Sequence, residues 1–428
     1  MLAQMEVPPK ASADVDQSHE TAQQLQSHAP RETEALVAAD ARVGIQNYGR
    51  LPLSFVKGKG ARLWDAKGKQ YLDFLGGIAV VTVGHSHEYV TEAITQQAST
   101  LVHSSNIYFI EPQVRLAERL HELSGGMRAF FCNSGAEANE AALKLARKWA
   151  KGKGESKVEI ITTIDSFHGR TYGSLAATGQ PKYHEGFEPM PQGFRYVPRN
   201  DVEALKAAVS QRTAAIMLEP IQGESGIQPM SDEYLQAARA LCDEFGAALI
   251  FDEVQCGMGR TGTFFGFEPS GVQPDIISLA KGLGNGVPIG ALLAREDVAA
   301  AFVPGTHGCT FGGNFLSCAA ANATLDVLFE ENLMENAREV GAYFVAQLKA
   351  WGEETGAITE VRGRGLMVGV ELNVPHARNL MKECLETGLV FNAVGDTILR
   401  FLPPLCISHA DVDEAMQTLR AAWAEVAK

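Results

Sequence analysis

Short apolar segments alternate with amphipathic segments between residues 90 and 300. The apolar segments have the length of buried strands, and the segments between them repeat apolar residues at helical spacing. The expected strands are 128–132, 158–163, 214–218, 248–251, 276–279 and 289–293, and the expected helices are 111–122, 134–150 and 232–245. Strands that alternate with helices indicate βαβ units and a largely parallel α/β sheet with both faces covered.

The pattern changes after about residue 325. A long helix is followed by an apolar strand at 366–371, a helix, an apolar strand at 397–402 and a last helix. This order predicts a smaller α+β domain. Near the N-terminus, residues 55–65 and 71–74 are typical of short strands around turns.

The domain boundaries follow from these patterns. Residues 1–40 are rich in Ala, Gln, Ser, Asp and Glu and contain few large apolar residues, so we expect a mobile or weakly helical tail. We expect an N-terminal segment, 41–75, that packs on the small domain. The large domain is expected over 76–325 and the small C-terminal domain over 326–428.

Charge and hydrophobicity exclude two classes of partner. The 428 residues include 37 Lys and Arg against 51 Asp and Glu, which gives a formal net charge of −14. An acidic chain lacks the basic field that attracts a phosphate backbone. No apolar run reaches the roughly 18 residues of a membrane-spanning helix. We therefore expect no nucleic-acid partner and no membrane span.

The cysteines and the N-terminus predict a compartment. The chain has seven cysteines and no C-x-x-C pair, which is typical of a reducing compartment and of neither a disulfide framework nor a zinc site. The N-terminus has no basic segment followed by an apolar one, so we expect no secretory signal. The expected location is the cytoplasm, and no metal site is expected.

Four groups of residues follow the expected strands, where open α/β sheets bind ligands. In the first, small residues open the helix after strand 128–132. The N–H groups of Gly135 and Ala136 can hold a phosphate with help from the helix dipole. Ser134 and Glu137 also fit the S-x-x-E capping box, and the two interpretations are compatible.

The second group is Ser166-Phe167-His168-Gly169-Arg170-Thr171. The Phe167 ring can stack on a planar cofactor, and Arg170 can bind a carboxylate through two hydrogen bonds. The alternative is a surface loop with a solvated arginine, which the segment by itself favours.

The third and fourth groups centre on Asp252 and Lys281. An ionised Asp at the tip of a buried strand needs a partner, such as a pyridinium nitrogen, unless it caps the next element. Lys281 follows an apolar strand in a Gly-rich bend, where desolvation lowers an amine pKa and favours imine formation. An exposed lysine is the alternative. Together, in this order, the four groups match the needs of pyridoxal phosphate.

The sequence resembles the class III (ornithine-type) pyridoxal-phosphate aminotransferases, and among them the acetylornithine branch, from about Tyr48 to the C-terminus. The matching segments are 76–80, 131–140, 167–171, 218–224, 252–257, 280–284, 310–314 and 399–404. The resemblance implies fold type I: a large domain with a mostly parallel seven-stranded sheet, a smaller α+β C-terminal domain and an interdomain cleft for the cofactor. It also implies a homodimer with two shared active sites.

The resemblance assigns the cofactor contacts residue by residue. It implies that Lys281 forms the imine and shuttles the proton, that Asp252 keeps the ring nitrogen protonated, that Gln255 contacts the ring hydroxyl and that Phe167 stacks on the ring. For the phosphate it implies Ser134, Gly135 and Ala136 of the same subunit and Thr310 of the neighbouring subunit.

The resemblance also assigns substrate contacts. It implies that Arg170 binds a substrate carboxylate and that Glu224 and Arg400 form a switchable pair, with Arg400 released for the α-carboxylate of glutamate. Cys309 stands where Ser or Thr is commoner, at a position that touches substrate in the acetylornithine branch. Tyr48 is a further expected substrate contact.

The implied activity is a transaminase reaction. Glutamate gives its amino group to the cofactor and leaves as 2-oxoglutarate, and a terminal aldehyde then accepts the amine. The expected pair is N-acetylglutamate 5-semialdehyde and N-acetylornithine, a step of arginine biosynthesis. Ornithine, succinylornithine, 4-aminobutyrate and aminoadipate-semialdehyde carried on LysW remain alternatives, and so does an aminomutase, which needs no 2-oxo acid.

Overall fold

The computed structural model describes residues 32–153 and 156–428, which form two compact units. One unit holds the described chain up to Lys57 together with Trp64–Lys69, and the other holds Gly58–Leu63 and Gln70–Lys428. Of the tail expected over 1–40, residues 1–31 lie outside the described residues. Thr33–Val43 (α2) is a helix without a buried residue, so it contributes no side chain to a core.

The secondary structure alternates through the middle of the chain, as the hydrophobic pattern predicts. The strands are β1 (Phe55–Lys59), β2 (Arg62–Asp65), β3 (Gln70–Asp73), β4 (Arg128–Cys132), β5 (Glu159–Thr163), β6 (Phe194–Val197), β7 (Thr213–Leu218), β8 (Ile221–Gln222), β9 (Gln228–Pro229), β10 (Ala248–Asp252), β11 (Ile276–Leu279), β12 (Gly290–Ala294), β13 (Ile358–Arg364), β14 (Met367–Leu372), β15 (Leu389–Val390), β16 (Asn392–Val394) and β17 (Ile398–Phe401). The helices are α3 (Gly76–Ala79), α4 (Glu88–Thr100), α5 (Glu111–Leu123), α6 (Gly135–Lys151), α7 (Tyr172–Ala177), η1 (Pro181–Tyr183), α8 (Val202–Ala208), α9 (Asp232–Phe245), η2 (Glu268–Ser270), η3 (Lys281–Gly284), α10 (Glu296–Ala299), α11 (Phe315–Glu330), α12 (Leu333–Thr355), α13 (Ala377–Thr387) and α14 (His409–Val426).

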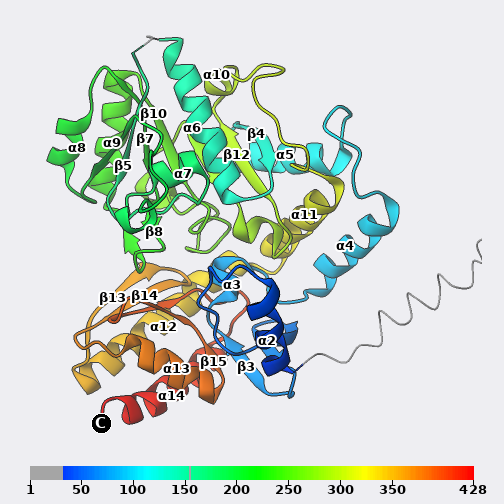
Figure 1. Cartoon of the computed structure of the whole chain (residues 1–428), viewed down its shortest axis with the longest axis vertical. Helices are drawn as coiled ribbons and strands as arrows, with labels where there is room; N and C mark the ends of the chain where they lie inside the picture. Colours follow the sequence, from blue (N-terminus) through cyan, green and yellow to red (C-terminus); the bar gives the residue numbers. More distant parts are fainter. Residues whose placement is uncertain (1–31, 154–155) are drawn as a thin grey trace, which may run out of the picture. The chain divides into compact units, whose positions relative to one another are not determined.

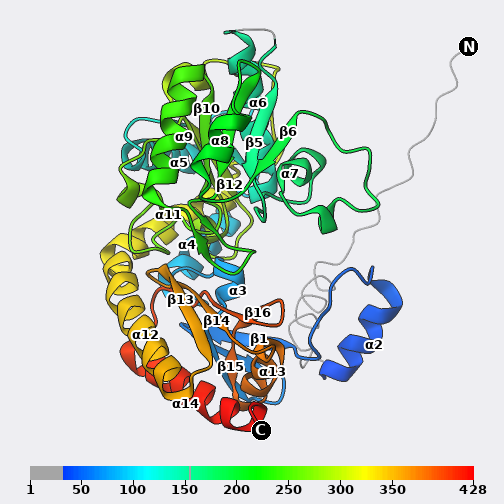
Figure 2. The same cartoon turned by 90° about the vertical axis from the view of Figure 1, so that its left-hand side faces the viewer.

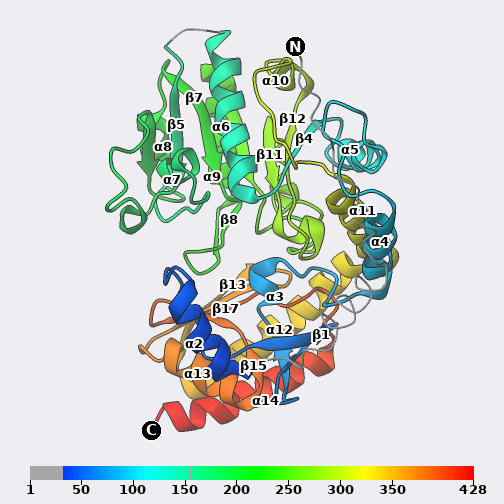
Figure 3. The ribbon, with the colours of Figure 1, turned by 45° about the vertical axis from the view of Figure 1, so that its right-hand side comes forward.

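Seven strands form the main sheet in the order β4-β12-β11-β10-β7-β5-β6. The pairs from β11 to β6 are parallel, whereas β12 is antiparallel to both of its neighbours. Helix α6 lies across this sheet (Figure 1, Figure 3). The fold class predicted from the sequence, fold type I with a mostly parallel seven-stranded sheet, is confirmed.

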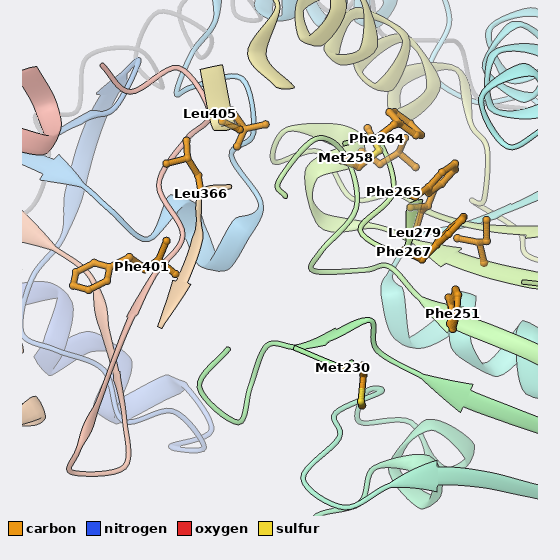
Figure 4. Close-up of a cluster of buried hydrophobic side chains, with 14 of the residues drawn as sticks. Met230, Phe251, Met258, Phe264, Phe265, Phe267, Leu279, Leu366, Phe401 and Leu405 are labelled. Atoms are coloured by element: carbon orange, nitrogen blue, oxygen red, sulfur yellow. The ribbon is translucent and has the colours of Figure 1, made fainter. Parts of the chain in front are cut away.

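Helices cover both faces of the main sheet. Neighbouring residues of a strand point to opposite sides, so one strand contributes to the core on each face. On one face, Ile250 of β10 belongs to a cluster with Leu145 and Trp149 of α6. On the other face, Phe251 belongs to the larger core that includes Leu235 of α9. Figure 4 shows Phe251 in this larger core beside Phe267, whose ring centroid is 5.4 Å away. Burial on both faces fixes the register of β10 and so the place where it ends.

A second, four-stranded sheet has the order β13-β14-β17-β16 and is antiparallel throughout. Helices α12 and α14 lie side by side in this part of the chain (Figure 2). Strand β15 pairs in parallel with β3 instead of joining this sheet. The sheet with its helices is the α+β arrangement predicted for the C-terminal part.

Several observed elements are not among the predicted ones, and β6, β13 and α11 are examples. The edge strands β6 and β13 are not expected from the sequence. Each has only one buried residue, so neither shows the apolar run or the regular alternation that predicts a strand. The long helix expected after about 325 is α12, and a second helix that was not expected, α11, precedes it. Asn332 separates them in a left-handed conformation (φ +53°) that stops an α-helix.

Candidate active site

Five strands of the main sheet end at one pocket of about 400 Å³. The segments after β4, β5, β7, β10 and β11 supply most of its wall. The lining residues include Asn133, Ser134, Gly135, Ala136, Asn139, Phe167, His168, Arg170, Glu219, Asp252, Val254, Gln255 and Lys281. The parallel sheet thus brings together residues that are up to 148 positions apart in the sequence, between Asn133 and Lys281.

Asp252 is the last residue of β10, and its carboxylate is buried. Oδ2 accepts hydrogen bonds from His168 Nδ1 at 2.8 Å and from Asn139 Nδ2 at 2.7 Å. Oδ1 accepts the backbone N–H of Val254 at 3.0 Å. Three donors fix the position of the carboxylate at the pocket wall.

Lys281 begins η3 directly after β11 and has a positive φ of 41°, a strained conformation for a residue with a side chain. Burial lowers its pKa below the ordinary value, although the carboxylates of Glu224, Asp252 and Glu219 act in the opposite direction. A larger fraction of the amine is therefore neutral than in an exposed lysine. A neutral amine is the form that attacks a carbonyl or accepts a proton.

The N-terminus of the 17-residue helix α6 forms the next part of the wall. Ser134 caps the helix, and its hydroxyl accepts the backbone N–H of Glu137 at 3.2 Å. The first N–H groups of a helix have no acceptor within it, and the helix dipole favours an anion there. A Cβ at Gly135 would lie 2.7 Å from a methyl group of Val254, so only glycine fits at this position.

Phe167 and Arg170 line the pocket from the segment after β5. The Arg170 guanidinium lies over the Tyr183 ring at 3.9 Å and is 5.5 Å from the centroid of Phe167. Arg170 is exposed, whereas Phe167 is half-buried. The aromatic face orients the guanidinium while leaving it open to a carboxylate.

Glu224, Arg400 and Gln255 form a connected group next to this pocket. Arg400 NH1 lies 2.9 Å from Glu224 Oε1, and Gln255 Nε2 donates to the same oxygen at 3.1 Å. Burial alone would raise the pKa of Glu224, but Arg400, Lys281 and these hydrogen bonds together hold it below its ordinary value. The lowered pKa favours the ionised form of Glu224, beside the buried side chain of Arg400.

Besides Glu224 and Arg400, which lie next to it, three more of the expected site residues do not line this pocket. Thr310 is exposed, and Cys309 lines a separate cavity of about 920 Å³ with Asn106 and His307. Asn133, which lines the first pocket, donates through Nδ2 to Cys309 Sγ at 3.1 Å. Tyr48 is an exposed residue of the N-terminal unit. The roles expected for these residues stay predictions.

Three other residues at the pocket have no role in the sequence-based interpretation. Asn139 and His168 hold Asp252, and the buried carboxylate of Glu219 accepts the backbone N–H groups of Phe167 at 2.8 Å and Gly223 at 3.2 Å. The sequence offers one indication for Asn139: it is an amide residue at a position on the otherwise apolar buried face of α6. His168 and Glu219 lie in the segments 167–171 and 218–224, which match the family, but their spacing in the sequence does not reveal their hydrogen-bond partners.

Burial raises the pKa of Glu219 to about 7, and the charge of Asp252 adds to this effect while His168 opposes it. Burial similarly raises the pKa of Glu253, the neighbour of Asp252, to about 7. Both carboxyl groups therefore titrate near neutral pH, beside a carboxylate that three donors hold in place.

The model for the family described as "Aminotransferase class-III" matches residues 44–423 of the chain. The protein is a class-III aminotransferase. It is 53% identical over 385 residues to an acetylornithine aminotransferase of Methanocaldococcus jannaschii, covering 90% of this chain and 96% of that protein. It is 49% identical over 392 residues to an acetylornithine aminotransferase of Caldanaerobacter subterraneus, covering 91% of this chain and all of that protein.

Solved structures of aminotransferases have the same fold. An ornithine aminotransferase of Toxoplasma gondii superposes with a TM-score of 0.89 at 33% identity, over 97% of this chain and 99% of that one. An acetylornithine aminotransferase of Elizabethkingia anophelis gives a TM-score of 0.82 at 34% identity, over 92% of this chain and all of that one. The predictions of the family, of transaminase chemistry and of pyridoxal phosphate as cofactor are confirmed.

The pocket residues fit pyridoxal phosphate. The helix N-terminus suits a phosphate, the buried carboxylate of Asp252 suits a protonated ring nitrogen, and the lowered pKa of Lys281 suits a bond to an aldehyde. The Gln255 carbonyl Oε1 is buried without a hydrogen-bond partner among the described residues, so it is an unsatisfied acceptor at the pocket wall.

No helix within residues 32–153 or 156–428 combines the length and apolar character needed to cross a membrane. In the same part of the chain, no group of three or more His, Cys, Asp or Glu side chains is arranged to hold a metal ion.

Proposed function

We propose that this aminotransferase acts on N-acetylornithine and glutamate, with N-acetylglutamate 5-semialdehyde and 2-oxoglutarate as the corresponding oxo compounds, in arginine biosynthesis. The observation that carries this proposal is the 53% identity to an acetylornithine aminotransferase across 96% of that protein's length. Identity to the ornithine aminotransferase of T. gondii is 33%. Several relatives that are 46–53% identical over about 90% of this chain are acetylornithine aminotransferases, and this agreement supports the acetylated substrate.

The cofactor contacts of the proposed enzyme use the pocket wall. The backbone N–H groups of Gly135 and Ala136, with Ser134, bind the phosphate; Asp252 binds the ring nitrogen, and Gln255 binds the ring hydroxyl. In a further contact, Phe167 stacks on the ring. The cofactor, when bound, supplies an aldehyde for the amines and a ring that accepts electrons from the carbon bearing the amino group.

Lys281 supplies the proton transfer. Its Nζ accepts the proton from the Cα of glutamate or from the Cδ of N-acetylornithine and returns a proton later in the half-reaction. The half-buried position at the pocket wall supports this role because desolvation lowers the pKa of the amine.

Two arginines divide the carboxylates of the substrates. Arg170 holds the carboxylate that is remote from the reacting carbon: the γ-carboxylate of glutamate or the α-carboxylate of N-acetylornithine. Arg400 holds only the α-carboxylate of glutamate and is otherwise neutralised by Glu224, 2.9 Å away. A site with one permanently free and one switchable arginine accepts both substrates. Cys309 and Tyr48 remain proposed contacts to the acylated substrate.

The proposed functional unit is a homodimer with shared active sites. Ile107, Tyr108 and Phe109 are exposed large hydrophobic residues, and Phe109 is 98% exposed. Their loop is tied to the loop of Thr310, because Asn106 Nδ2 donates to the Cys309 and Gly312 carbonyl groups. Three consecutive exposed apolar side chains on one loop support an interface, and the interface supports delivery of Thr310 to the neighbouring subunit's cofactor phosphate.

The proposed location is the cytoplasm. All seven cysteines, from Cys132 to Cys406, are free, and five of them are buried. Free thiols are typical of a reducing compartment.

A substrate panel tests the proposal. The purified enzyme is given 2-oxoglutarate with N-acetylornithine, N-succinylornithine, ornithine or 4-aminobutyrate, and glutamate formation is measured. We expect kcat/KM for N-acetylornithine to exceed that for ornithine by at least about tenfold, since a site shaped for an amide discriminates against a charged amine. A higher value for ornithine or 4-aminobutyrate would contradict the substrate, and turnover without 2-oxoglutarate would indicate an aminomutase.

A further inference from the structure

Three residues form a row across the second sheet. Gly369 of β14 is the register partner of Arg362 on β13 and of Arg400 on β17. Directly opposed residues of neighbouring strands point to the same face of a sheet. The two arginines therefore stand on one face, with a residue that has no side chain between them.

The segment 223–227, which carries Glu224, lies on this row. At one end, Arg400 NH1 donates to the Gly223 carbonyl at 3.1 Å. At the other end, Arg362 Nε donates to the carbonyls of Gly226 at 3.0 Å and Ile227 at 2.9 Å. The hairpin of β8 and β9 that contains this segment reaches the edge strand β13 (Figure 1).

The gap left by Gly369 is filled by the same segment. A Cβ at Gly369 would lie 2.7 Å from the Gly226 carbonyl oxygen and 3.0 Å from the Ile227 Cβ. Any side chain at this position would push the segment away from the sheet. The absence of a side chain is therefore what lets the segment lie between the two arginines.

The backbone of the segment is strained where Arg362 holds it. Ile227 has φ +59°, a left-handed conformation that is rare for a β-branched residue, and its neighbour Gly226 has φ +95°. Ile227 is fully buried. A strained conformation persists only where surrounding contacts maintain it, and the bonds from Arg362 are such contacts.

Arg362 is not available to bind a substrate. Its side chain is 5% exposed, and its two terminal nitrogens lie 2.8 Å from Glu360 and 2.9 Å from Glu371. Thr397 in turn donates to Glu371 Oε1 at 2.7 Å. The guanidinium is neutralised and fixed, so what it contributes is the position of the segment that it holds.

We propose that Arg362 is a positioning residue for the Glu224–Arg400 pair, and that Gly369 provides the space this arrangement needs. By holding residues 226 and 227, Arg362 keeps Glu224 against Arg400 and so limits how readily Arg400 becomes free for a second carboxylate. The inference rests on the proposed function of that pair. It adds that the choice between the two amino donors is controlled from β13, through a residue that touches neither substrate.

The test measures each half-reaction separately by stopped-flow absorbance, with glutamate or N-acetylornithine as the only substrate. The enzymes compared are the wild type, Arg362→Gln, Glu224→Ala and the double variant. We expect Arg362→Gln to raise the ratio of kcat/KM for glutamate to that for N-acetylornithine by roughly three- to tenfold, because hydrogen bonds that keep Glu224 in place are lost. The double variant should have the same ratio as Glu224→Ala alone, since the effect of the Arg362 substitution acts through Glu224.

The matched control is Arg364→Gln. Arg364 lies two residues along the same strand, but it donates to Gly266 and pairs with Asp232 instead of contacting segment 223–227. The ratio of kcat/KM for glutamate to that for N-acetylornithine should be the same in Arg364→Gln as in the wild type. Gly369→Ala perturbs the same segment without removing a charge and should shift the ratio in the same direction as Arg362→Gln. It serves as the test if Arg362→Gln does not fold.

The inference is overturned if Arg362→Gln and Gly369→Ala lower kcat/KM of both half-reactions by one common factor. It is also overturned if the Arg362 and Glu224 substitutions change the ratio independently in the double variant. Failure of the proposed function looks different, because the wild-type enzyme itself would then not react with one of the two donors.

Discussion

Glu224 and Arg400 lie 2.9 Å apart although they are 176 positions apart in the sequence. The Arg400 side chain is 3% exposed, and the Glu224 side chain is 25% exposed. The pair therefore has one buried partner that needs a counter-charge and one more exposed partner that can move. This asymmetry favours movement of Glu224 rather than Arg400 when a substrate carboxylate takes its place.

Arg170 and Arg400 should have separable effects. Arg400→Ala should damage mainly the glutamate half-reaction, whereas Arg170→Ala should damage both halves, with each lost contact costing about 2–5 kcal/mol of transition-state stabilisation. Glu224→Ala should improve glutamate relative to N-acetylornithine. Single-turnover measurements of each half-reaction decide this, and equal losses in both halves for Arg400→Ala would exclude a switch.

Lys281 should be required for turnover but not for cofactor binding. Lys281→Ala should lower the single-turnover rate by at least roughly 10³-fold, because the proton acceptor is lost. The other pocket contacts should retain pyridoxal phosphate through dialysis. Lys151→Ala, at the exposed end of α6, is the control and should behave as the wild type. Near-normal turnover by Lys281→Ala would refute the assignment.

Asp252 should set the strength of the electron sink. An ion pair at ~4 Å with an effective dielectric constant of ~20 is worth roughly 4 kcal/mol, so Asp252→Ala should lower kcat by about 10²–10⁴-fold. Asp252→Glu should lower kcat less, because the charge is retained. Steady-state kinetics with N-acetylornithine and 2-oxoglutarate provide the measurement. A kcat for Asp252→Ala within about threefold of the wild type would disprove this role.

Glu219 should make the free energy of unfolding depend on pH. Its pKa is raised from the ordinary 4.5 to about 7, so the folded protein retains a proton that the unfolded chain releases between these values. The stability contribution is therefore present below pH ~4.5 and is lost as the pH rises through ~7, by at most about 3 kcal/mol.

Urea unfolding of the wild type and Glu219→Gln from pH 5 to 8 measures this effect. The wild type should lose stability relative to the variant as the pH rises, while the contribution of Glu253 cancels because both proteins contain it. Parallel pH curves for the two proteins would be evidence against the raised pKa.

Phe109 should lie in the proposed dimer interface. Phe109→Asp places a charge on the apolar surface, so we expect sedimentation to show a shift from dimer to monomer. Activity should fall together with the dimer fraction if Thr310 acts on the neighbouring subunit. The matched control is Phe187→Asp, which places the same charge at an exposed phenylalanine on the loop between η1 and β6 and should leave the dimer intact. A fully active monomeric Phe109→Asp would contradict the shared site.

The sequence by itself determined most strands of the main sheet and the edge of the sheet at which the pocket lies. The apolar periods located β10 and β11, and parallel strands covered on both faces present their carboxyl ends at a common edge. Asp252 and Lys281 therefore had to lie near each other. The residue types then limited the chemistry. A carboxylate at the end of a strand, an amine and a helix N-terminus made of small residues together suit pyridoxal phosphate.

Only the tertiary structure decided which residues hold these groups in place. Asn139 and His168 reach Asp252 because α6 lies across the sheet and because the segment after β5 folds back over β10. The row of Arg362, Gly369 and Arg400 depends on the register of three antiparallel strands, and a shift of one residue would turn both arginines to the opposite face. Periodicity indicates which face of a strand is buried, but neither strand order nor register follows from it, because both depend on packing between distant parts of the chain.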